Sequence, residues 1–234
     1  MVKTFRRIRK NVVTPAHAPS IPGFAAQCAV SKVCNEDRTP PLFAPPILVI
    51  DLEATCDEGD GLPAAEMEII EIGAVWATAD GEILDSFEAL VRPVVHPQLS
   101  AFCSQLTGIQ QAEVDGADLF SRVAQQLADF AQKHPSATTW GSWGKFDAKQ
   151  LAQDCERHGT PHPLPGLVHV NLKRQFAKAR KIKEVGMARA LQMVDLPLDG
   201  AHHRGLSDAK NIAKLLPWCP LPSPGHEGSV GHTD

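Results

Sequence analysis

The chain lacks several features that would each indicate a class of protein. It has six cysteines in 234 residues but no C-x-x-C pair or other zinc-ligand spacing, so neither a disulfide framework nor a structural zinc site is expected. No apolar run is long enough to span a membrane, no signal-peptide pattern is present, and no internal repeat is found. We therefore expect a cytoplasmic protein in a reducing environment, with no membrane partner.

The chain also lacks an excess of positive charge and contains no tyrosine. Its 27 acidic residues outnumber its 23 basic residues, which gives a net charge of -4. This balance is unusual for a protein that grips a long nucleic-acid duplex by its backbone, because such binding depends on lysine and arginine.

Proline and glycine are concentrated at the two ends of the chain. Residues 1–44, which are also basic, and residues 217–234 are expected to be flexible. Residues 45–216 can bury one substantial hydrophobic core but are too few for two full domains, so we expect one domain. The scarcity of acids in residues 1–36 leaves an organellar transit sequence open, although prolines interrupt any amphipathic helix after Thr14.

The first informative pattern is an acidic pair that closes an apolar strand. Asp51 and Glu53 follow the run ILVI, which is typical of a buried strand. Side chains two apart on a strand share a face, so both carboxylates point one way and Leu52 points into the opposite layer. A lone D-x-E pair is most often a solvated strand end or an ion-pair partner. Here it closes an apolar strand, where uncompensated charge is costly.

Two further patterns place acids at the starts of helices. Asp147, in SWGKFDAKQL, opens an amphipathic helix, where a helix-capping role is the simplest interpretation. In HHRGLSDAKNIAKLL, Ser207 is predicted as the N-cap, which puts Asp208 in the first turn and His203 in the loop before it. Gly205 would let that loop bend back, and the adjacent His202 is predicted to be a surface or supporting residue.

Together these patterns predict a metal centre. Four carboxylates gathered at one point repel one another strongly unless divalent cations hold them together. A histidine beside them indicates metal-assisted hydrolysis.

The three segments, in this order, resemble the motifs of the DEDDh 3′-5′ exonucleases of the ribonuclease H-like fold. The chain is similar to the enhancer-of-RNA-interference branch, which includes histone-mRNA exonucleases and bacterial relatives, in DLEATC, EMEIIEIGAVW, FCSQLTGIQQAEV and GLSDAKNIAKLL. The resemblance covers about residues 47–216. It implies an α/β fold with a mixed central sheet of about five strands flanked by helices.

The resemblance also implies roles for individual residues. The metal ligands for two Mg²⁺ (or Mn²⁺) ions would be Asp51, Glu53, Asp147 and Asp208, and the general base would be His203. The expected reaction releases nucleoside 5′-monophosphates from the 3′ ends of single-stranded nucleic acid, with RNA favoured over DNA. The related subclass that uses tyrosine in place of this histidine is excluded, because the chain has none. The negative net charge suits an enzyme that handles only a few terminal nucleotides.

Two groups of residues are candidate substrate contacts. A basic stretch without acids contains Lys173, Arg174, Lys178, Arg180, Lys181 and Lys183. Alone it would be a solvated helix face, but in a nuclease it is better interpreted as a phosphate-binding flank. The helical spacing of Phe102, Leu106 and Ile109 predicts core positions for at least two of them, whereas in similar enzymes this segment lies at the active-site edge and stacks on terminal bases. Glu68 and Glu71 are predicted to be surface or structural charges.

The remaining patterns predict the other elements and leave two rival functions open. After the strand that holds Asp51, strands are expected at 67–76, 83–91, 137–143 and 167–171, and helices at 99–111, 116–133 and 147–158, with further helices from near Glu184 to Leu216. The rivals are a ribonuclease H-type endonuclease and an adaptor that binds an RNA end without cutting it. The sequence does not fix the oligomeric state.

Overall fold

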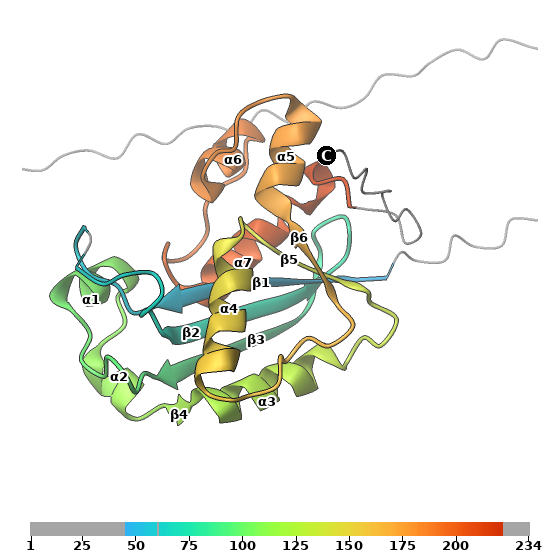
Figure 1. The fold of residues 1–234 in the computed structure, drawn as a ribbon. Helices are drawn as coiled ribbons and strands as arrows, with labels where there is room; N and C mark the ends of the chain where they lie inside the picture. The colour runs from blue at the N-terminus through green and yellow to red at the C-terminus, as the bar shows by residue number, and fades with distance from the viewer. Residues whose placement is uncertain (1–44, 60, 222–234) are drawn as a thin grey trace, which may run out of the picture. The chain divides into compact units, whose positions relative to one another are not determined.

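The computed structural model describes residues 45–59 and 61–221, so the predictions for residues 1–44 and most of 217–234 lie outside it. The described elements form a mixed sheet with helices on both faces (Figure 1). The strands are β1 (Ile47–Ala54), β2 (Ile69–Ala77), β3 (Ile83–Arg92), β4 (Asp118–Leu119), β5 (Thr139–Ser142) and β6 (Val168–Asn171). Their order is β4-β3-β2-β1-β5-β6. The resemblance predicted about five strands, and the additional one is the two-residue β4.

The sheet combines an antiparallel meander with parallel additions on each side. β1, β2 and β3 are consecutive in the chain and pair antiparallel. β5 pairs parallel with β1, β6 parallel with β5, and β4 parallel with β3. The turn between β2 and β3 includes Gly81, whose φ of +84° suits glycine. This is the predicted order of a meander followed by crossovers.

Helices cover the sheet in two layers. They are α1 (Ala101–Thr107), α2 (Gln111–Asp115), α3 (Phe120–Ala131), α4 (Phe146–Arg157), α5 (Leu172–Arg180), α6 (Met187–Met193) and α7 (Gly205–Ala213), followed by the 3-10 helix η1 (Leu216–Trp218). Helices α3 and α4 share one core cluster with the sheet, whereas α5, α6 and α7 share the cluster on the other face. None of the described helices is long and apolar enough to cross a membrane.

Several helix boundaries differ from the predictions. The helix predicted at 99–111 is two helices, because Gly108 adopts a left-handed conformation and ends α1. The helix predicted at 116–133 begins at Phe120, after β4. The helix expected near Glu184 begins three residues later, as α6. The packed core continues past residue 216, since Cys219 is buried against α5. The four described cysteines are free thiols.

Candidate active site

The acidic pair of β1 points into one layer of the domain, as predicted. Val49 belongs to the core cluster that includes α7, whereas Leu52 belongs to the cluster that includes α3 and α4. Because side chains alternate along a strand, Asp51 and Glu53 share the face of Val49 and point towards α7. The two carboxylates therefore lie at the carboxyl end of a buried strand, beneath one helix.

Two glycines bring that helix into direct contact with the sheet. A Cβ atom at Gly73, the residue opposite Asp51 in β2, would lie 1.9 Å from the backbone carbonyl carbon of Gly205. A Cβ atom at Gly205 would lie 2.8 Å from the backbone nitrogen of Gly73. The role of Gly205 is thus close packing at the start of α7, and its φ is not in the left-handed region. As a result, ligand oxygens of Asp51, Glu53 and Asp208 all lie within 4.8 Å of one another.

Asp147 approaches the same place from α4. Its Oδ1 accepts a hydrogen bond of 3.2 Å from the backbone N–H of Leu52, between the two acids of β1. It lies inside the first turn of α4, and the N-cap is Lys145, so the predicted capping role is wrong. Asp147 is not one of the three carboxylates within 4.8 Å of one another, but its charge acts directly on Asp51.

The electrostatics of the site match those of a cation-binding centre. Burial, followed by the charges of Asp147, Glu53 and Asp208, raises the pKa of Asp51 well above its usual value. Burial and the charge of Asp208 raise the pKa of Glu53 to about 8, and burial raises the pKa of Asp147. Like charges in a buried site favour protonation unless a cation compensates them. Asp208 Oδ1 is buried without a hydrogen-bond partner among the described residues, so this carboxylate oxygen is available as a metal ligand.

A pair of histidines flanks Asp208. Its Oδ2 accepts the backbone N–H of His203 at 2.9 Å and lies 2.8 Å from Nδ1 of His202. The two imidazoles stack, with ring centroids 4.0 Å apart and planes 15° apart. Burial and the neighbouring His202 lower the pKa of His203, which keeps its ring neutral and able to accept a proton. His203 has a φ of +61°, an uncommon conformation that its backbone hydrogen bond to Asp208 holds.

Glu71 holds the start of α7 in place. Its carboxylate, fully buried, accepts hydrogen bonds from Nε and Nη2 of Arg204 and, at 2.7 Å, from the backbone N–H of Gly205. The N-cap residue of α7 is Arg204, so the prediction of Ser207 was wrong. The acceptor for the first helical N–H is Glu71 of β2 and not a side chain close to the helix in the sequence. The structural interpretation of Glu71 is confirmed and the surface interpretation is wrong. The sequence feature that could have indicated this burial is that Glu71 is an acid inside an otherwise apolar strand.

Comparison with known proteins places this chain in a family. Residues 48–216 match the family model described as Exonuclease, or RNase_T. The chain belongs to this exonuclease family. The matched range contains all five predicted catalytic and metal-binding positions.

Relatives of the exonuclease domain include named 3′-5′ exoribonucleases. The chain is 35% identical over 180 residues to "3'-5' exoribonuclease 1" of Mus musculus, covering 72% of this chain and 51% of that protein. It is 30% identical over 215 residues to "3'-5' exonuclease eri1" of Schizosaccharomyces pombe, covering 78% of this chain and 69% of that protein. The chain thus spans about half the length of the mouse relative.

A solved structure supports the fold assignment. The nuclease domain of 3′hExo, described as a DEDDh family member bound to rAMP, is 33% identical, with a TM-score of 0.68. The match covers 74% of this chain and 90% of that one. The ribonuclease H-like exonuclease fold expected from the sequence is thereby confirmed.

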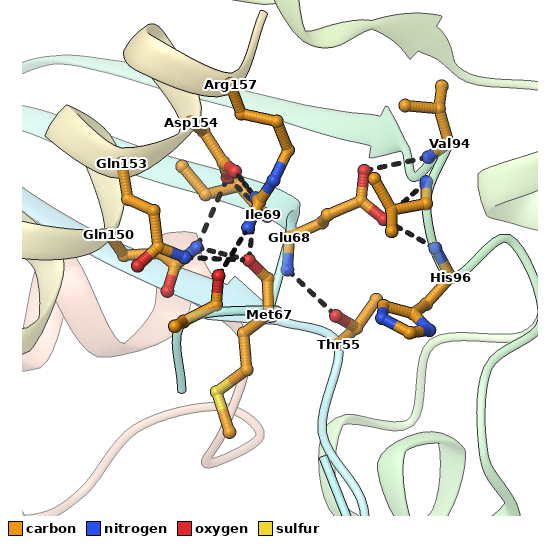
Figure 2. Close-up of polar contacts among 12 residues, drawn as sticks. Thr55, Met67, Glu68, Ile69, Val94, His96, Gln150, Gln153, Asp154 and Arg157 are labelled. Atoms are coloured by element: carbon orange, nitrogen blue, oxygen red, sulfur yellow. Dashed lines mark hydrogen bonds and ion pairs between the residues drawn. The ribbon is translucent and has the colours of Figure 1, made fainter. Parts of the chain in front are cut away.

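Two more buried acids of the exonuclease domain form hydrogen bonds that fix the segment leading into β2 (Figure 2). Glu68, just before β2, accepts hydrogen bonds from the backbone N–H groups of Val94, Val95 and His96 at 2.8 to 2.9 Å. Its own N–H donates to Oγ1 of Thr55. Glu68 is buried, so its expected surface position is wrong and its structural role is confirmed.

The second of these acids is Asp154, which lies in α4. Asp154 accepts the backbone N–H of Ile69 at 2.7 Å and pairs with Arg157. The side chains of Arg157, Gln150 and Gln153 all donate to the carbonyl oxygen of Met67 (Figure 2). The helix that supplies Asp147 is thus fixed to the start of β2.

The α1 segment lies against the end of β1. The hydroxyl of Ser100 donates to the carbonyl oxygen of Cys56 at 2.7 Å. Ile109 is fully buried, but Phe102 and Leu106 are each 37% exposed. The prediction of at least two core positions is therefore wrong, because these two side chains point away from the small cluster around Ile109.

The basic stretch forms α5 and the turn after it. Arg174, Lys178 and Lys181 are exposed, and Lys173 is half-buried. Because α5 follows β6, these side chains lie two strands away from β1 in the sheet, outside the carboxylate cluster.

Proposed function

We propose that this chain is a metal-dependent 3′-5′ exonuclease that removes nucleoside 5′-monophosphates from single-stranded RNA. One observation carries the proposal: three carboxylates from β1 and α7 meet within 4.8 Å, with Glu53 and Asp208 buried and Asp51 half-buried, beside a histidine with a lowered pKa. The naming of the relatives as exoribonucleases and the rAMP-bound state of the 3′hExo nuclease domain support RNA as the substrate.

The residues of the site fit divalent metal ions. Asp51, Glu53, Asp147 and Asp208 would hold two Mg²⁺ or Mn²⁺ ions, since hard cations prefer carboxylate oxygens. Oδ1 of Asp208, which has no hydrogen-bond partner among the described residues, would be a ligand atom of this type. When bound, such ions stabilise the charge on the attacking and leaving oxygens of an in-line phosphodiester displacement.

His203 would serve as the general base. Its lowered pKa keeps the imidazole neutral near physiological pH, so it can take a proton from the attacking water. Asp208 Oδ2 fixes the backbone of His203 and contacts His202, which stacks on the His203 ring. The same aspartate would thus orient the base and contribute to the metal site.

The outer contacts would hold the RNA strand. Phe102 and Leu106 are exposed side chains on α1 at the end of β1, where they can stack on the terminal bases. Lys173, Arg174, Lys178 and Lys181 would bind phosphates along α5.

A time course with 5′-labelled single-stranded RNA and DNA of one sequence tests the proposal. We expect a ladder that shortens from the 3′ end with Mg²⁺ or Mn²⁺, no products with EDTA, and faster cleavage of RNA. Strands that are retarded but uncut under every metal condition would contradict the proposal and favour an end-binding adaptor. Cleavage of a circular RNA would instead indicate an endonuclease.

The variant His203→Ala tests the base. We expect turnover to fall by about 100-fold to 10,000-fold, while metal-dependent RNA binding, measured by fluorescence anisotropy, is largely retained. His202→Ala is the matched control, because His202 also contacts Asp208 but has no base role in the proposal. Unchanged turnover of His203→Ala would remove this residue from the mechanism.

A further inference from the structure

A groove outside the carboxylate cluster runs along the edge of the sheet. It encloses about 720 Å³ between α4, β6 and α5. Among the residues that line it are Lys145 and Lys149 from α4, His169 and Asn171 from β6, and Arg174 and Lys178 from α5. β6 is the last strand of the sheet, so among the described residues its outer edge has no neighbouring strand.

The groove has cations on both walls. Lys145 and Lys149 are four residues apart on α4, and Arg174 and Lys178 are four residues apart on α5, so each pair lies on one helix face. The two helices belong to the clusters on opposite faces of the sheet (Figure 1). The two pairs of cations therefore line the groove from helices on opposite sides of β6.

These charges are uncompensated. The lining residues include no aspartate or glutamate, and none of the four cations has an ion-pair partner within the described part of the chain. The whole chain nevertheless carries a net charge of -4. A concentrated positive potential in an otherwise acidic protein indicates a polyanionic ligand.

The groove begins beside the candidate active site. Lys145 is the N-cap of α4 and precedes the proposed metal ligand Asp147 by two residues. Ser142, at the end of β5, lies with its hydroxyl 3.0 Å from Nε2 of His169 in the groove. The start of α4 thus supplies both a groove residue and a proposed metal ligand, and the groove continues along β6, the parallel neighbour of β5.

We infer that this groove binds the phosphate backbone of the RNA segment that lies 5′ to the nucleotide being removed. The inference rests on the proposed exonuclease function and adds Lys145 and Lys149 to the phosphate contacts expected on α5. A strand whose 3′ end is held at the carboxylates carries one phosphate per nucleotide, so it can meet successive cations as it leaves the site. An acidic peptide is not a substrate of the proposed reaction, so it would not be held with one end at the carboxylate cluster.

The test compares Lys149→Gln/Arg174→Gln with Arg92→Gln/Arg122→Gln. The control removes the same charge from exposed positions on β3 and α3, towards the opposite edge of the sheet. Binding of a single-stranded RNA of about ten nucleotides is measured in EDTA over a range of salt concentrations, so that no turnover is required. We expect the groove variant to bind more weakly and the slope of log K against log salt to become shallower by about 0.7 for each lost contact.

Length dependence gives the second readout. The ratio of kcat/KM for the longer RNA to kcat/KM for a dinucleotide should fall in the groove variant but not in the control. An unchanged salt slope and an unchanged ratio would overturn the inference. Tighter binding of a polyglutamate peptide than of RNA, lost in the groove variant, would also overturn it. Absence of turnover in the wild type would refute the exonuclease function. The binding data in EDTA would still show whether the groove binds RNA.

Discussion

The domain contains two sets of carboxylates, all of them buried except the half-buried Asp51, that differ in what surrounds them. Glu68, Glu71 and Asp154 accept hydrogen bonds from backbone N–H groups, and two of them also pair with an arginine. Asp51 and Glu53, in contrast, face other acids, and burial and repulsion raise their pKa values. A buried acid with complete partners stabilises the fold, whereas a buried acid without them stores an unfavourable charge that a cation can relieve.

The first way to break this contrast is to neutralise an acid of the site. Asp51→Asn should lower the rate of RNA hydrolysis by at least about 1,000-fold, or about 4 kcal/mol, because it removes a proposed metal ligand. It should also raise the melting temperature of the metal-free protein at neutral pH, since a repelled carboxylate is gone. Calorimetry in EDTA and single-turnover kinetics measure the two effects. A lower melting temperature for Asp51→Asn than for the wild type would mean that Asp51 stabilises the fold, as the structural acids do.

The second way is to neutralise an acid of the structural set. Glu71→Gln should destabilise the protein by about 3 kcal/mol, because it removes the buried carboxylate that pairs with Arg204 and accepts the backbone N–H of Gly205. Denaturant unfolding in EDTA measures this loss. Arg122→Gln is a suitable control, because its ion pair with Asp118 is exposed and contributes little. A stability equal to that of the wild type would mean that Glu71 is not the support of α7.

The two sets also differ in how visible they are in the sequence. Asp51 and Glu53 were predictable because an apolar run led directly into them, and the alternation of a strand then fixed their shared face. Asp208 and His203 followed from a helix-start pattern, even though the N-cap residue was misplaced. Each of these inferences needed only residues close together in the chain. The family resemblance then linked the separate segments to one site.

The structural acids could not be assigned in this way. Glu71 bonds to Arg204, which is 133 residues away in the sequence, and local patterns carry no information about such a partner. The contact between Gly73 of β2 and Gly205 of α7 could not be predicted for the same reason. Each position requires glycine because the backbone of the other residue, far away in the sequence, lies against it. Phe102 and Leu106 show the converse error. Their helical spacing is the same whether the face meets the core or solvent.

The third way to sharpen the contrast uses pH. The pKa of Glu53 is about 8 in the folded protein against 4.5 for the free side chain, so the folded state binds more protons between these values. By linkage, this group stabilises the metal-free protein fully below about pH 4.5, and that stabilisation is lost as the pH rises to about 8. Melting temperatures in EDTA should therefore fall across this window.

Added Mg²⁺ should reverse the trend, because the ion binds the deprotonated carboxylates and so stabilises the folded state more as pH rises. Glu53→Gln is the matched variant, and it should show a flatter pH dependence in EDTA and a smaller response to Mg²⁺. The structural acid Glu71 provides the contrast: Glu71→Gln should lower the melting temperature while leaving most of the Mg²⁺ response intact. Equal Mg²⁺ responses in the wild type and Glu53→Gln would mean that Glu53 does not contribute to metal binding.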